Sequence, residues 1–186
     1  MRKLVSLLSL LVVFSLAVSA ANTAITADLF TAKPAGIYVV TGVTVTHITP
    51  TAVGEQGVSM KPSFKMSSAV KAKLKGSKAS THAEPAAEFV FVGADFRPSS
   101  ITLIELDQKD DKREFVTATG GMRGVKIGFD KKATIAYESV ALGDNLHKIT
   151  PSSPLKPGKE YAFVRASLTE AYPFGVYAAA ERANNQ

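Results

Sequence analysis

The chain has 186 residues, with 22 Lys and Arg against 16 Asp and Glu, and it contains no Cys. The lack of cysteine excludes disulfides, thiol catalysis and lipid attachment at a cysteine, so stability must come from packing. A net charge of +6 is only mildly basic, and it gives no specific signal for nucleic-acid binding.

The N-terminus has the layout of a signal peptide. Arg2 and Lys3 precede an apolar run over residues 4–18, and small residues follow up to Ala20. The run is interrupted by serines and is shorter than the roughly 20 residues of a spanning helix. We therefore expect residues 1–20 to direct export and to be removed. The remaining chain, with a net charge of 20 − 16 = +4, would lack a transmembrane segment and act in the periplasm or outside the cell.

The chain after the signal peptide begins with residues 21–33, which lack a clear period and predict a flexible leader. Residues 34–186 are expected to form a single β-sandwich domain, with 34–87 as a candidate extension. Two β-branched runs, 37–41 and 43–48, flank Gly42 and predict the first hairpin.

Residues 70–75 alternate between apolar and lysine side chains. The alternation predicts a strand at a sheet edge, with Lys71, Lys73 and Lys75 on one face and apolar residues inward. Two interpretations of the lysines stay open. They either protect the edge against association with another chain, or they form an anion-binding face.

The next predicted strands follow in chain order. Residues 88–92 predict a compact apolar strand, and both faces of this strand can be buried. Residues 101–106 and 113–118 flank a charged segment at 107–112 and predict the clearest hairpin. Further strands are expected at 125–129, 133–140 and 146–150, and no long stretch keeps a helical period.

The most informative stretch is a rigid turn at Pro157 and Gly158 that leads into an alternating strand from Tyr161. Residues 155–161 resemble the corner before the penultimate strand of fibronectin type III and related immunoglobulin-like sandwiches. The resemblance implies a tyrosine corner, in which the Tyr161 phenol bonds to backbone upstream and Leu155 plugs the crossing between sheets. After a break at Tyr172 and Pro173, residues 174–179 would supply the closing strand.

A second resemblance spans more of the chain. It rests on three segments: Gly36-Ile37-Tyr38, Lys112-Arg113-Glu114, and the late Pro157-Gly158-Lys159-Glu160-Tyr161-Ala162-Phe163 with Phe174-Gly175-Val176. Together they are similar to a group of uncharacterised secreted bacterial β-sandwich proteins. This resemblance implies export and no particular activity.

About ten short strands separated by turns predict an all-β fold, a β-sandwich that is immunoglobulin-like in its C-terminal half. A β-barrel is the alternative, because periodicity alone does not distinguish a closed sheet from two packed sheets.

The sequence names no catalytic residue, metal ligand or cofactor site. The three histidines lie far apart, and the aspartates at 107, 110 and 111 alternate with lysines, as is typical of a solvated hairpin tip. We expect a non-enzymatic exported protein that acts by surface binding in the cell envelope, with an envelope protein or an anionic surface as partner. A secreted hydrolase of unrecognised type is the alternative, since active sites assembled from distant residues leave no local motif.

Overall fold

The computed structural model describes residues 25–61, 67–121 and 124–178. The fold is all-β, with two short 3-10 turns, η1 (Ala27–Phe30) and η2 (Pro98–Ser100). Residues 1–24, which include the expected signal peptide at 1–20, and residues 62–66, 122–123 and 179–186 lie outside the described residues. In the described part of the chain, no helix has the length and apolar character that crossing a membrane requires.

The strands of the described residues form three sheets, and all but one of their pairings are antiparallel. Sheet A has the order β13 (Tyr137–Gly143), β14 (Leu146–Pro151), β7 (Glu88–Val92), β1 (Gly36–Thr41), β2 (Thr44–His47). Sheet B has the order β12 (Thr134–Ile135), β8 (Ile101–Glu105), β15 (Glu160–Arg165), β16 (Glu170–Val176), β3 (Thr51–Ala52), with β6 (His82–Ala83) parallel to β16. Sheet C has the order β11 (Gly124–Ile127), β10 (Lys112–Gly121), β5 (Ser67–Lys75), β4 (Gly54–Lys61), with β9 (Asp107–Gln108) on β10.

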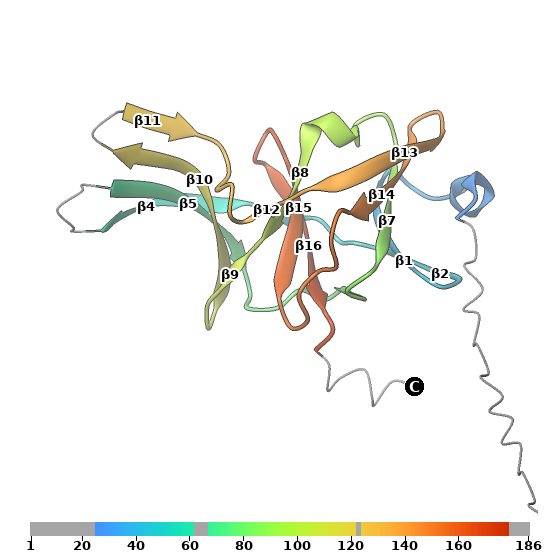
Figure 1. Ribbon diagram of the computed structural model, residues 1–186, viewed down its shortest axis with the longest axis horizontal. Coiled ribbons are helices and arrows are strands. Elements are labelled where there is room, and N and C mark those ends of the chain that lie inside the picture. The colour runs from blue at the N-terminus through green and yellow to red at the C-terminus, as the bar shows by residue number, and fades with distance from the viewer. Residues whose placement is uncertain (1–24, 62–66, 122–123, 179–186) are drawn as a thin grey trace, which may run out of the picture.

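The three sheets are arranged in a row, with sheet B in the middle (Figure 1). Sheets A and B enclose the main aromatic core, and sheets B and C enclose a second, smaller core. No sheet closes on itself within the described residues. The prediction of an all-β sandwich is therefore confirmed, and sheet C adds a third layer that the sequence did not predict.

Strand β15 shows why sheet B needs a cover on both faces. Tyr161 and Phe163 point into the core shared with sheet A, whereas Ala162 and Val164 point into the core shared with sheet C. Successive side chains of a strand alternate between faces, and here both sets are apolar. A sandwich of only two layers would leave one of these faces in water.

The prediction that residues 101–106 and 113–118 form a hairpin is wrong. Strand β8 pairs with β12 and β15 in sheet B, whereas β10 pairs with β5 and β11 in sheet C. Leu106 is buried between the layers, and its backbone N–H donates to the Glu160 carbonyl oxygen at 2.8 Å. The chain therefore crosses from sheet B to sheet C at Leu106, and only β9 folds back onto β10.

The predicted break at Pro173 is also absent, because β16 runs through it and Pro173 lies opposite Ala162. On the other side of β16, β3 pairs with residues 170–171 and β6 with residues 175–176. Pro173 lies between these two described pairings. A proline, which cannot donate a ladder hydrogen bond, is tolerated at such a place.

The N-terminal segments are part of the three layers. Within the expected leader, Phe30 is buried on the outer face of sheet A, where its ring meets Tyr38 edge to face at 5.9 Å. The first hairpin is confirmed, since β1 pairs with β2 around Gly42, whose φ is +59°. Residues 34–87, the candidate extension, supply strands to all three sheets.

A buried ion pair joins sheets B and C. Arg113 of β10 lies with its Nη1 3.3 Å from Glu160 Oε2 at the start of β15, and the two side chains are 3% and 6% exposed. The guanidinium also donates to the carbonyl oxygens of Gly76 and Lys75, at 2.9 and 3.0 Å, and the Ala79 N–H donates to Glu160 at 2.8 Å. Burial lowers the pKa of Arg113, and the Glu160 carboxylate partly restores it.

Candidate functional site

The three predicted lysines lie on the outer face of sheet C, opposite the apolar residues that pack on sheet B. Ala72 and Leu74 are fully buried, as the alternation predicted. The predicted edge position is wrong, because β5 lies between β4 and β10 and both neighbours pair with it. The sequence concealed this arrangement because β4 is glycine-rich and carries a register shift between Gly54 and Gly57.

Carboxylates neutralise part of this lysine face. Lys71 Nζ is 3.0 Å from Glu114 Oε2 and 3.7 Å from Asp107 Oδ2, and Lys112 Nζ is 3.6 Å from Glu114 Oε1. Burial alone would raise the pKa of Glu114, but the hydrogen bond and charge of Lys71, with Lys112, outweigh it and hold that pKa below its ordinary value. The Glu114 carboxylate therefore stays charged at neutral pH, and Lys71 is a partner within the sheet.

Lys73 and Lys75 differ from Lys71 in their ion pairing. Neither lysine enters an ion pair among the side chains that the structure describes. Lys73 lines a hollow of about 240 Å³ together with Gly57, Val58, Lys71 and Glu114. This hollow can hold the anionic groups of a surface, but it has no enclosed walls that would select a particular molecule.

Sheet C extends beyond the layer that it covers, and the hairpins β4–β5 and β10–β11 project from the rest of the molecule (Figure 1). We call this projecting part the wing: Gly57 and Val58 of β4, residues 68–71 of β5, residues 117–121 of β10, and β11. A register shift between Val116 and Ala118 marks its base, where the Thr117 hydroxyl donates to the Val70 carbonyl oxygen at 3.3 Å.

The inner face of the wing carries apolar side chains that nothing in the described chain covers. Val58, Val125 and Ile127 are 64%, 74% and 84% exposed. Sequence reasoning predicted a strand at 125–129 but assigned no function to these residues. The signal was present in the alternation of Val125, Lys126 and Ile127, but the pattern did not show whether that apolar face was covered.

The predicted corner residues form a separate, structural group. The Lys156 backbone N–H donates to the Tyr161 hydroxyl oxygen at 2.9 Å, and Leu155 is buried in the main core. Gly158 follows Pro157 with a φ of +72°, a conformation that glycine adopts without strain. The Tyr161 phenol thus bonds to backbone upstream, and in this bond its hydroxyl oxygen is the acceptor.

Replacing the corner tyrosine should destabilise the protein without changing its fold. In Tyr161→Phe, the Lys156 N–H loses its partner, and we expect the free energy of unfolding to fall by about 1–3 kcal/mol. Urea melts should show a lower midpoint with an unchanged slope. Tyr177→Phe removes a hydroxyl from a half-exposed ring and is the matched control. Equal midpoints for Tyr161→Phe and the parent protein would contradict a stabilising corner.

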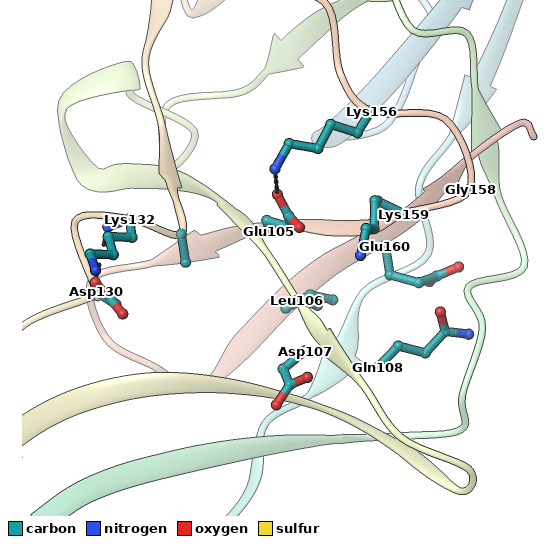
Figure 2. Close-up of a pocket in the computed structure, with 11 residues that line it drawn as sticks. Glu105, Leu106, Asp107, Gln108, Asp130, Lys132, Lys156, Gly158, Lys159 and Glu160 are labelled. Atoms are coloured by element: carbon teal, nitrogen blue, oxygen red, sulfur yellow. Dashed lines mark hydrogen bonds and ion pairs between the residues drawn. The ribbon is translucent and has the colours of Figure 1, made fainter.

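A polar cavity of about 500 Å³ lies beside the corner, between the β8–β9 segment, the turn at 130–133 and residues 156–160 (Figure 2). Lys156 Nζ donates to Glu105 Oε2 at 2.9 Å across it. Its described lining contains carboxylates and lysines but no Ser, Thr, Tyr or His. This lining therefore lacks the hydroxyl and imidazole groups of a Ser–His type of nucleophile and base.

Metal chemistry finds no support in the described residues, where no group of three or more His, Cys, Asp or Glu side chains lies close enough to hold an ion. Comparison of the chain with protein-family models, with curated proteins and with solved structures gives no match.

Proposed function

We propose that the protein is exported and acts without catalysis, by binding an anionic surface through sheet C. The observation that supports this most is the wing, a projecting sheet with lysines on its outer face and exposed apolar residues on its inner face. A projecting sheet can reach a large partner, whereas a hollow as open as the one at Lys73 suits groups on a surface. The resemblance to secreted bacterial proteins favours the cell envelope as the place of action.

Export predicts a defined N-terminus for the working protein. We expect the exported chain to begin within a few residues of Ala21, because small residues up to Ala20 follow the apolar run. N-terminal sequencing of the protein from the periplasm or the medium measures this directly. Recovery of a chain that keeps Met1 in the membrane fraction would mean that residues 4–18 serve as an anchor.

Binding through the lysine face predicts a loss of affinity when its charges are removed. We expect the combined change Lys71→Gln, Lys73→Gln and Lys75→Gln to weaken binding to anionic vesicles and acidic polysaccharide roughly tenfold or more, since a lysine near an anionic surface contributes about 1 kcal/mol. Binding of the parent protein should fall steeply as salt rises. Sedimentation with vesicles and retention on immobilised polygalacturonate measure the two affinities.

The matched control changes the same number of charges elsewhere. Lys131→Gln, Lys132→Gln and Lys159→Gln remove three exposed lysines that lie outside sheet C. The single variant Lys71→Gln leaves the Glu114 carboxylate with Lys112 alone, so its urea melt measures how much of the triple variant's effect comes from lost stability. An equal loss in the control triple variant would assign the binding to net charge and would count against sheet C as the binding surface.

A further inference from the structure

We infer that the anionic surface is a lipid bilayer, and that the inner face of the wing enters its interface. This inference rests on the proposed function, because it names the chemistry of that surface. It depends on two independent observations: the uncovered apolar side chains of the wing, and the absence of carboxylates from the wing residues that the structure describes.

The apolar side chains form a continuous row across four strands. Val58 lies opposite Val70, Val70 opposite Ala118, and Ala118 opposite Ile127. Residues that face each other in register lie on the same side of a sheet. Val125, two residues before Ile127, adds to the same face.

This face continues one that is buried elsewhere in the same sheet. Toward the base of sheet C, Ala72, Leu74 and Phe115 point to the same side and pack against sheet B. Beyond the register shift at Thr117 the covering layer ends, and Val58, Val125 and Ile127 face solvent. A soluble sheet usually places polar residues on such a face, so an apolar row there indicates a partner.

The charge of the wing identifies the kind of partner. The wing residues that the structure describes contain no Asp or Glu, and their basic residues are Lys71 and Lys126. The nearest acid of β10, Glu114, lies toward the base and pairs with Lys71 and Lys112. The wing therefore combines an apolar inner face with lysines on its outer face, and Lys126 enters no ion pair among the described side chains.

An anionic bilayer complements both properties. Valine and isoleucine side chains gain free energy by entering the boundary between headgroups and acyl chains, and lysines are attracted to the anionic headgroups around them. A second copy of this chain would bring a second acid-free wing, so it would offer Lys126 no carboxylate from its own wing. An acidic polysaccharide would pair with the lysines but would leave the valine and isoleucine row in water.

The first test removes the apolar character and keeps the charge. Val58→Thr, Val125→Thr and Ile127→Thr retain β-branched side chains at exposed positions, so the fold and the lysines stay as they are. We expect the triple variant to bind vesicles of phosphatidylglycerol and phosphatidylcholine about tenfold or more weakly than the parent protein, because less apolar surface enters the interface. Binding to polygalacturonate should not change. Val43→Thr with Val140→Thr changes two exposed valines, one in the turn between β1 and β2 and one in β13, as the control.

The second test uses the absence of tryptophan from the sequence. Ile127→Trp introduces a single fluorophore on the inner face, and its emission should shift to shorter wavelength with phosphatidylglycerol vesicles but not with polygalacturonate. Val43→Trp places the same fluorophore at the turn between β1 and β2, and its emission should not shift. Both proteins keep the same N-terminus, so the apolar run at residues 4–18 does not account for a difference between them.

The outcomes separate this inference from the proposed function. If the parent protein binds neither vesicles nor polygalacturonate, both fail. If the parent protein binds both and the threonine variant binds vesicles equally well, the proposed function stands, and the inference that the surface is a bilayer is wrong. A shift of the Ile127→Trp emission with rising protein concentration, in the absence of vesicles, would assign the face to a second copy and overturn the bilayer.

Discussion

Replacing Arg113 with methionine should lower the free energy of unfolding by about 3–5 kcal/mol, because it leaves the buried Glu160 carboxylate without its cation. The two side chains are almost fully enclosed between sheets B and C, and the guanidinium also satisfies two backbone carbonyl groups. Domains of this size are typically stable by about 5–15 kcal/mol, so the variant would be close to unfolding. Urea melts followed by circular dichroism measure the effect.

The double variant Arg113→Met with Glu160→Gln tests whether the unpaired carboxylate causes this loss of stability. Removing both charges takes away the unpaired buried carboxylate, and we expect it to recover part of the stability that the single change loses. Lys109→Met breaks the exposed pair with Asp107, whose atoms lie 3.1 Å apart, and should change stability by no more than about 0.5 kcal/mol. A double variant less stable than Arg113→Met would show that the ion pair is not what joins the layers.

The second large effect is expected at the centre of the main core. Phe163 is fully buried, and its ring centroid lies 4.9 Å from that of Phe89, 5.2 Å from Phe91 and 5.7 Å from Phe174. Phe163→Ala removes these ring contacts and leaves a cavity, so we expect a loss of about 3–5 kcal/mol. A lower urea midpoint and a weaker near-ultraviolet dichroism signal are the measurements.

Two control variants at aromatic positions are expected to lose less stability. Phe163→Leu keeps much of the side-chain volume and should cost less than half as much. Phe129→Ala removes a ring that is only partly buried at the margin of the smaller core, and it should also cost less. A similar, small loss in all three variants would place the centre of stability elsewhere.

Local patterns in the sequence predicted individual strands well, and they failed where a second layer decides the pairing. The run at 88–92 coincides with β7, and Gly42 separates β1 from β2. The charged segment at 107–112 has the composition of a hairpin tip, yet burial of Leu106 between layers sends β8 and β10 into different sheets. Pairing over such distances depends on tertiary packing, which local periodicity does not contain.

The candidate site was predictable only in part, for the same reason. Alternation placed Lys71, Lys73 and Lys75 on one face, but the carboxylate that neutralises Lys71 comes from Glu114, 43 residues away on β10. The exposed row of Val58, Val125 and Ile127 has the same sequence pattern as a buried face. Which apolar residues are exposed depends on where the covering layer, sheet B, ends, and the sequence pattern does not show this.

The order of the strands has a consequence for how the chain folds as it is made. Strand β5 lies between β4 and β10, which is formed by residues 112–121, and β3 near the N-terminus pairs with β16, one of the last strands. No layer is complete until most of the chain is available, and pairings between distant segments form slowly. A ribosome-bound chain should therefore hold no stable subset of the three layers, and the finished protein should fold in one cooperative transition after its C-terminal strands emerge.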